Sequence, residues 1–140
     1  MAKFGYWRNG FLEIAGVDMS DHCQEFSVAE TTDELPNDAH GGFVKEITPG
    51  LEDWTLTAKF YQDFAAANIH FTLRNAKQNR TLVSLRYRAD KGATSATNPM
   101  YSGSGYVVAY TGFQGAHGAN LMANVTLRPG SGSQIVETLT

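Results

Sequence analysis

One stretch, residues 49–63, constrains the fold more than any other part of the sequence. From 54 to 60, apolar residues occupy every second position, which is the period of a strand with one buried face. This apolar set is Trp54, Leu56, Ala58 and Phe60. Pro49-Gly50 at the start of the stretch is a typical turn pair, and Asp63 at its end can cap a helix by accepting a backbone N–H. The stretch therefore predicts a turn, a half-buried strand and the start of a helix.

The remaining sequence contains further strand-like segments and a single helix-like one. We expect strands at 11–17, 23–29, 81–89, 101–110 and 121–127, and a β-prone tail at 134–140. A helix is expected at 64–77, where Ala65, Ile69, Leu73 and Ala76 share one face, although alternation from Ile69 leaves a strand open. At 140 residues with 14 glycines, the chain is expected to form one domain, 1–140. Its predicted class is mainly β, a β-sandwich or barrel with one flanking α-helix.

The segment before the strand in 49–63 is expected to be an extended loop at about 31–47. Residues 31–42 are turn formers and acids with almost no apolar residue, and 43–48 lead into the strand. A loop of this length is expected to be functional or mobile. A second turn is expected near the N-terminus at Asn9-Gly10, a strong hairpin dipeptide.

Charge is unevenly distributed along the chain. Residues 1–63 hold twelve acids against four bases, and residues 64–140 hold two acids against seven bases, within a net charge of −3. One fold can mix the two halves into a balanced surface, or an acidic face of one copy can meet a basic face of the next. The slight acidity argues against tight nucleic-acid binding, which needs a basic footprint.

Composition also indicates where the chain is made. A single cysteine excludes an internal disulfide and favours an intracellular origin. No apolar run approaches the ~18 residues of a membrane span, and the N-terminus lacks the features of a signal peptide. We therefore expect a protein made in the cytoplasm that does not bind membranes by itself.

The sequence offers little that resembles catalytic chemistry. His22 beside Cys23 is the nearest approach to a reactive pair, but adjacency supplies neither a positioned base nor a lowered thiol pKa. Asp18, Asp21 and His22 lack a second ligand pair at zinc or calcium spacing. The other histidines are scattered at His40, His70 and His117. We therefore expect no enzyme, no metal site and no cofactor.

Several short motifs occur in a fixed order. The predicted helix is preceded by Pro49-Gly50-Leu51-Glu52-Asp53-Trp54, by Phe60 and by Gln62-Asp63. It is followed by Asn98-Pro99-Met100-Tyr101 and a Gly-rich link. An apolar strand then ends near Pro129-Gly130. In this order and spacing, over roughly 11–130, the chain resembles the tail tube (major tail) proteins of long-tailed bacteriophages. The motif positions expected in its core and turns are Pro49, Gly50, Leu51, Trp54, Phe60, Gln62, Asp63, Asn98, Pro99 and Tyr101.

The resemblance implies a structural virion protein that assembles into hexameric rings stacked into a hollow tube, through which DNA leaves the head. It also implies that the 31–47 loop and extended terminal arms reach neighbouring subunits. The expected interface residues are Asp33, Glu34, Leu35, Pro36, Asp38, His40, Phe43, Lys45 and Lys59. Candidates for an acidic lumen are Glu13, Glu25, Asp33, Glu34 and Asp38. The implied partners are further copies of the chain, a tape measure protein, a tail terminator and a distal tail protein, with DNA passing transiently.

Two alternatives stay open at this point. A related phage structural protein, such as a tail terminator, a distal tail hub or a head decoration protein, would form a single ring or a capsid-bound oligomer. A small β-barrel module that binds a ligand would stay monomeric.

Overall fold

The computed structural model describes residues 10–66 and 68–140. The predicted Asn9-Gly10 turn and the N-terminal arm lie outside the described residues. The strands are β1 (Phe11–Ile14), β2 (Val17–Asp18), β3 (Cys23–Pro36), β4 (Ile47–Tyr61), β5 (Val83–Arg88), β6 (Met100–Gln114), β7 (Met122–Pro129) and β8 (Val136–Thr138). The helices are a 3-10 turn, η1 (Ser20–His22), and α1 (Ile69–Asn79).

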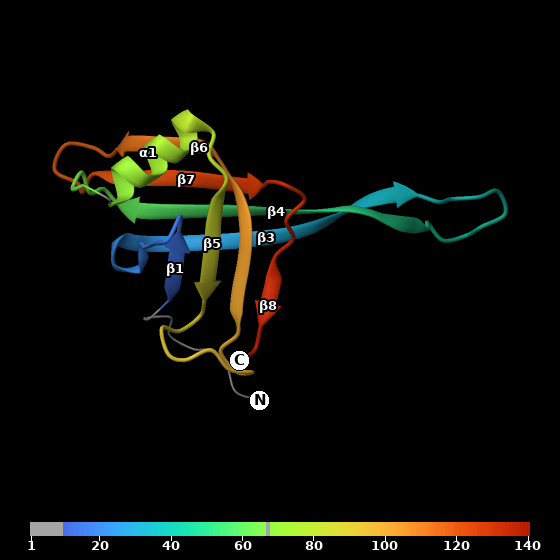
Figure 1. The fold of residues 1–140 in the computed structure, drawn as a ribbon. Helices are drawn as coiled ribbons and strands as arrows, with labels where there is room; N and C mark the ends of the chain where they lie inside the picture. The colour runs from blue at the N-terminus through green and yellow to red at the C-terminus, as the bar shows by residue number, and fades with distance from the viewer. Residues whose placement is uncertain (1–9, 67) are drawn as a thin grey trace.

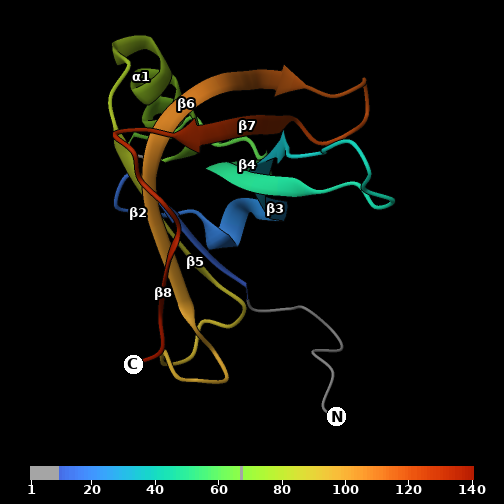
Figure 2. The same ribbon diagram turned by 90° about the vertical axis from the view of Figure 1, so that its right-hand side faces the viewer.

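The strands form a single antiparallel sheet that folds into two layers. Strand β6 belongs to both layers and connects them. The strand order is β2-β1-β5-β6-β7-β4-β3, with β8 also on β6. The first part of β6 pairs with β5 and β8, and the part after Gly105 pairs with β7. Figure 1 shows β1, β5 and β8 running across the direction of β3, β4 and β7, and Figure 2 shows β6 turning from one layer into the other. The predicted class, a β-sandwich or barrel with one flanking helix, is confirmed.

The core lies between these layers, and the alternating stretch supplies its centre. Trp54, Leu56, Ala58 and Phe60 are each at most 3% exposed, as their spacing predicts. The buried residues that pack around them come from β1, β5, β6, β7 and α1 and from the segment before η1: Leu12, Ile14, Met19, Val83, Leu85, Val107, Ala123, Val125, Leu127, Ile69, Leu73 and Ala76. The helix therefore covers one side of the core with a single apolar stripe.

Gly105 sits where β6 passes between the layers, paired with Val83 of β5 and Pro129 of β7. A Cβ built on it would lie 2.2 Å from the carbonyl oxygen of Arg128 and 2.9 Å from the Trp54 ring. At this bend, the Arg128 backbone and the Trp54 indole therefore approach residue 105 so closely that only glycine fits there.

We expect Gly105→Ala to lower the free energy of unfolding by about 3 kcal/mol, because the clash is with backbone and cannot relax by a rotamer change. The matched control is Gly92→Ala, whose added Cβ would meet nothing nearer than 3.6 Å. Urea unfolding of both variants measures the difference. Equal stabilities would show that the corner does not depend on glycine.

The structure corrects the predicted start of the helix. The helix was expected from 64, but α1 begins at Ile69, and the alternative strand from Ile69 does not form. Asp63 accepts the backbone N–H of Ala65 at 2.9 Å and the side-chain amide of Asn68 at 2.8 Å. The Asp63 side chain thus stabilises a turn ahead of the helix, while its backbone carbonyl accepts the N–H of His70 in the first helical turn at 3.1 Å. Within residues 10–66 and 68–140, no helix is long and apolar enough to cross a membrane.

The prediction of a loop over 31–42 is wrong for its first half. Residues 31–36 continue β3, which pairs with β4 as far as Pro36 opposite Ile47. The expected Pro49-Gly50 turn is also wrong, because both residues lie inside β4. The register shifts there by one residue, and a Cβ on Gly50 would lie 3.0 Å from that of Asp33. Pro49 stays paired with Glu34, while Gly50 and Leu51 together lie opposite Asp33 and form a β-bulge, which adds twist to a hairpin.

Two other boundaries differ from the sequence prediction. The strand expected at 11–17 is interrupted by a tight turn at Ala15 and Gly16, which have φ of 56° and 81°. Positive φ at both central residues is the geometry of a hairpin turn that follows strand twist. The C-terminal tail was expected to be an extended arm, but β8 pairs with β6 of its own chain.

Candidate assembly surfaces

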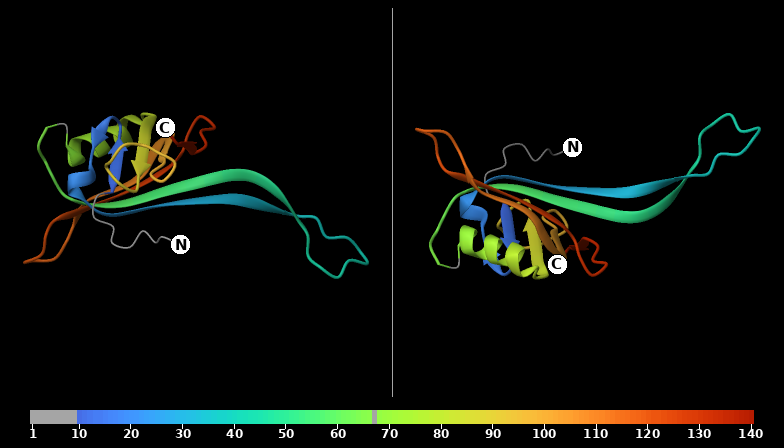
Figure 3. Two further views of the ribbon diagram at one scale, coloured as in Figure 1. Left: turned by 90° about the horizontal axis from the view of Figure 1, so that it is seen from below. Right: turned by 90° about the horizontal axis from the view of Figure 1, so that it is seen from above.

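The far half of the β3–β4 hairpin projects from the body as an arm, defined here as residues 31–53. β7 pairs with β4 only over 56–61, so the arm has no neighbouring strand outside the hairpin among the described residues. Figures 1 and 3 show it extending well beyond the two layers. At about 3.3 Å per residue, the strand portion 47–53 alone spans about 23 Å. The arm is therefore long enough to reach another molecule.

Apolar side chains are exposed along this arm. Phe43 is fully exposed, and Val44 and Leu51 are each 79% exposed. The apolar side chains of the arm that are more than half exposed are Leu35, Phe43, Val44, Ile47 and Leu51. Five large apolar side chains exposed on one hairpin are more than the scattered exposed hydrophobics of an ordinary surface, and such a surface is typical of an interaction site. Leu51, expected in the core or a turn, is instead part of this surface.

The arm is also strongly acidic. Between 31 and 53 the sequence has six carboxylates and one lysine, Lys45. At the base of the arm, Asp53 pairs with Arg128 of β7 at 2.5 Å. At the tip, the Glu46 N–H donates to the Asp38 carboxylate at 2.7 Å, and the Asn37 N–H donates to the Glu46 carbonyl at 3.0 Å. The tip loop thus has hydrogen bonds of its own.

Eight of the nine residues expected at an interface lie on this arm. They are Asp33, Glu34, Leu35, Pro36, Asp38, His40, Phe43 and Lys45, and all are exposed. Lys59 is separate, on the body. The sequence prediction missed Val44 and Ile47 because the segment was treated as poor in apolar residues. The available signal was the apolar residues at both ends of the polar run 36–42, Leu35 before it and Phe43, Val44 and Ile47 after it.

A polar face covers the layer β6–β7–β4–β3 on the side away from the core. Its residues include Glu25, Ser27, Thr55, Thr57, Lys59, Asn124 and Thr126. Glu25 lies opposite Lys59 in the β3–β4 register, so charges of both signs share this face. The five acids proposed for a lumen do not gather on it. Glu13 is on β1, 3.6 Å from Arg86, while Asp33, Glu34 and Asp38 lie on the arm.

The same layer has two strands with an unpaired edge. β3 pairs only with β4, and residues 106–114 of β6 pair only with β7 among the described strands. Unpaired edges present backbone N–H and C=O groups that can pair with another chain. Val108, on the β6 edge, is 51% exposed.

Gln62 and Asp63 hold the end of β4 against three other elements. The Gln62 side-chain amide donates to the Tyr110 hydroxyl at 3.0 Å and to the Gly112 carbonyl at 2.6 Å. Asp63 lies 3.0 Å from His22, and hydrogen bonds from Ala65, together with Asn68 and His22, keep the Asp63 pKa below its usual value. These two motif positions therefore organise the end of the body opposite the arm.

The second motif holds the loop before β6. The Asn98 side-chain oxygen accepts the N–H of Asp90 at 3.2 Å, while its amide donates to the carbonyls of Asp90, Gly92 and Ala93. Pro99 follows, and Tyr101 stacks on Tyr87 with ring centroids 5.4 Å apart. These contacts are structural.

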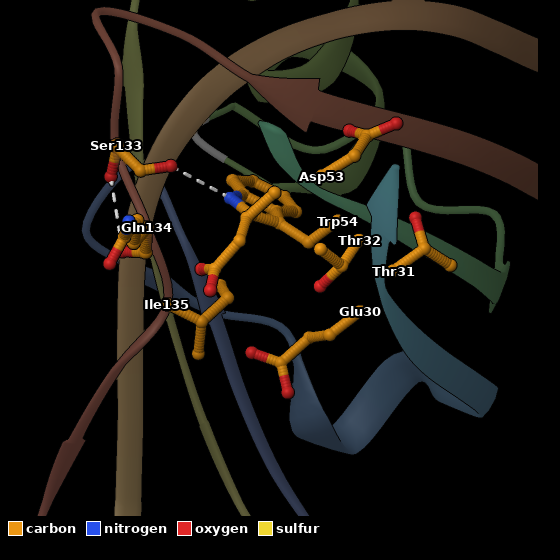
Figure 4. A pocket seen from close by; sticks show the side chains of 9 residues that line it. Glu30, Thr31, Thr32, Asp53, Trp54, Ser133, Gln134 and Ile135 are labelled. Carbon is orange, nitrogen blue, oxygen red and sulfur yellow. Dashed lines mark hydrogen bonds between the residues drawn. The ribbon is translucent and has the colours of Figure 1, made fainter. Parts of the chain in front are cut away.

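A shallow pocket lies at the base of the arm, lined by Glu30, Thr31, Thr32, Glu52, Asp53, Trp54, Ser133, Gln134 and Ile135. Figure 4 shows the Trp54 indole at its wall, donating its N–H to the Ser133 carbonyl at 3.0 Å. This hydrogen bond ties the segment before β8 to β4.

The residues considered for catalysis or metal binding each contact a different partner. Asp18 accepts from Ser20, Asp21 pairs with Lys91 at 2.8 Å, and His22 pairs with Asp63. Burial raises the pKa of the Cys23 thiol to about 12, so it carries almost no thiolate at neutral pH. In the described part of the chain, no group of three or more His, Cys, Asp or Glu could hold a metal ion.

Comparison with known proteins gives structural matches without sequence matches. No protein-family model matches the chain, and no curated protein matches it in sequence. A chain from the virion of a native gene transfer agent particle superimposes with a TM-score of 0.74 at 6% identity, over 96% of this chain and 99% of that one. A chain from the tail of an empty gene transfer agent particle with C6 symmetry gives 0.70 at 9% identity, over 99% of both chains. The SPP1 tail tube gives 0.69 at 12% identity, over 94% of this chain and 77% of that one. The chain therefore has the tail tube fold.

Proposed function

We propose that this chain is the structural subunit of a phage-type tail tube, in which rings of six copies stack around a channel for DNA. The fold it shares with the SPP1 tail tube and with a gene transfer agent tail of C6 symmetry supports the proposal. The observation that carries it is the four-stranded layer β6–β7–β4–β3, which ends in an unpaired strand on each side.

Strand directions in this layer allow neighbouring copies to continue it. All pairings are antiparallel, so β6 runs in the same direction as β4 and opposite to β3. Placing the β3 edge of one copy beside the β6 edge of the next therefore extends the sheet with an antiparallel pair. This contact joins two different surfaces, and a heterologous contact closes into a ring when the rotation per copy divides the circle.

We infer that the polar face of this layer lines the channel. A surface holds DNA through lysines and arginines that neutralise phosphates. Here Lys59 lies opposite Glu25, and Arg128 pairs with Asp53, so the cations of the face are matched by acids. Balanced charge and small hydroxyl side chains suit DNA that slides without binding.

This role places the protein in the virion and needs no catalytic group. A tube of finite length also has two ends and an interior. The partners proposed for the ends are a tail terminator and a distal tail protein, and the partner proposed for the interior is a tape measure protein.

Electron microscopy of the purified protein at increasing concentration tests the proposal. The expected result is hollow tubes with sixfold symmetry in cross-section. Isolated rings that never stack would favour a tail terminator, distal hub or decoration protein. A monomer at every concentration and salt tested would overturn the proposal.

The unpaired β6 edge gives a specific prediction. We expect Val108→Lys to abolish ring formation and leave the fold intact, because a lysine on an exposed edge strand opposes pairing with another chain. The control is Leu82→Lys, at a residue that is 41% exposed and precedes β5. Sedimentation measures assembly, and circular dichroism measures folding. Rings formed by the Val108 variant at the wild-type concentration would contradict a ring contact through β6.

A further inference from the structure

An exposed aromatic cluster lies at the end of the body opposite the arm. Phe64, Phe71 and Phe113, together called the end patch, are 45%, 46% and 71% exposed. Phe64 lies 5.6 Å from Phe113 and 4.8 Å from His70, and His70 lies 5.4 Å from Phe71, all between ring centroids. The cluster joins the loop after β4, the first turn of α1 and the end of β6. Phe64 and Phe113 are in contact, and Phe71 is joined to them through His70, so the rings form an exposed aromatic surface of the kind that marks a contact with another protein.

Hydrogen bonds hold this patch in place before any partner arrives. The His70 ring lies between the aromatic side chains, with Nδ1 3.0 Å from the Tyr110 hydroxyl. Gln62 donates to the same hydroxyl and to the carbonyl of Gly112, next to Phe113. A preorganised surface loses less entropy on binding, which favours a docking site over a loop that has failed to pack.

The end patch and the arm lie at opposite ends of the molecule. Figures 1 and 3 show the arm leaving one end of the body, while the start of α1, the end of β6 and the loop after β4 lie at the other. Two complementary surfaces at opposite ends cannot meet within one copy. Repeated between copies, such a contact gives an open filament.

The charges of the two surfaces are complementary. The arm has six carboxylates against one lysine, and five of these carboxylates remain after Asp53 pairs with Arg128 of its own chain. In contrast, α1 and its C-cap have three cations, Arg74, Lys77 and Arg80, and no acid. None of these three cations forms an ion pair with a described residue. Arg74 follows Phe71 by three residues, so it lies beside the patch on the helix surface. A partner for this end of the molecule should therefore be both apolar and acidic, as the arm is.

We propose that the arm of one copy docks on the end patch of a copy in the next ring. Phe43 and Val44 of the arm pack on Phe64, Phe71 and Phe113, and the arm carboxylates face the α1 cations. This inference rests on the proposed function, since stacked rings bring the two ends together, and it assigns the ring-to-ring contact to particular surfaces.

Crosslinking in assembled tubes tests the pairing directly. In a Cys23→Ala background, Lys45→Cys and Gln114→Cys, at exposed positions beside the apolar tip of the arm and beside Phe113, are made singly and together, so that the docking aromatic rings stay in place. A short bis-maleimide is added after assembly. We expect a ladder of linked subunits from the double variant, no crosslink from either single variant, and dimers only when the two single variants are assembled together. Tubes of the double variant without crosslinks, or dimers within one single variant, would overturn the docking.

The critical concentration for tube growth, measured on serine variants, tests how much the docking contact stabilises the tube. Phe43→Ser and Phe113→Ser remove exposed rings, so the subunit should remain folded, and Leu82→Ser is the matched control. Loss of a central apolar anchor should raise the critical concentration for tube growth about tenfold or more. Wild-type growth by both variants would refute the docking and leave the tube proposal standing. Failure of the wild type itself to form rings or tubes would refute the tube proposal.

Discussion

Replacing residues 37–46 with Asn-Gly is expected to abolish tube growth and leave a folded subunit. Pro36 and Ile47 are paired across the hairpin, so a two-residue turn can join them, and Asn-Gly is favoured in such turns. The replacement removes Phe43 and Val44, which make no part of the core cluster. Because the body is unchanged, its free energy of unfolding should shift by no more than about 0.5 kcal/mol. Urea unfolding and electron microscopy of the same preparation measure the two effects.

The control for this replacement keeps the apolar tip. A variant with Ala39→Ser and His40→Ser changes exposed loop residues but retains Phe43 and Val44, and it should grow tubes as the wild type does. Tubes of normal length from the shortened arm would mean that rings stack through the body alone. A shortened variant that does not fold would mean that the arm contributes to the subunit itself.

Trp54→Ala is expected to lower the free energy of unfolding by about 3–5 kcal/mol. The side chain is 3% exposed and fills the space above Gly103 and Gly105, where the layers meet. Its indole N–H is the hydrogen-bond partner of the Ser133 carbonyl, so the substitution also frees the segment before β8. For a domain whose total stability is about 5–15 kcal/mol, this loss is large enough to populate unfolded chains. Urea unfolding measures the change.

Trp54→Phe separates packing from hydrogen bonding. It keeps an aromatic ring and removes the donor to Ser133, so we expect a smaller loss, of about 1–2 kcal/mol. Phe43→Ala provides the exposed-aromatic control and should leave stability unchanged, since Phe43 is fully exposed. A change below about 1 kcal/mol for Trp54→Ala would contradict the central position given to the indole.

The strands of the body were readable because each has one buried face. Trp54 to Phe60 alternate with polar residues and are buried as predicted, and Ala123, Val125 and Leu127 of β7 alternate and are buried in the same way. The ordered turn and strand motifs similarly led to the tail tube fold. Alternation requires only that a strand have two different sides, so local sequence is sufficient to reveal it.

The arm and the end patch were not readable in this way. Both faces of the arm are exposed, so residues 31–36 carry no alternation, and their strand is determined by pairing with β4. The end patch joins Phe64 and Phe71 to Phe113, which lies more than forty residues later in the chain. No local pattern indicates that these rings share one surface.

By itself, the sequence determined the β-rich class, the buried stretch at 54–60 and the acidic character of the segment before it. Tertiary structure decided that this segment is a hairpin arm, that the helix begins at Ile69, and that β6 crosses between the layers at Gly105. The physical reason is range. Burial periodicity and charge are properties of neighbouring residues, whereas an exposed strand, a sheet edge and an aromatic surface exist only through contacts between distant parts of the chain.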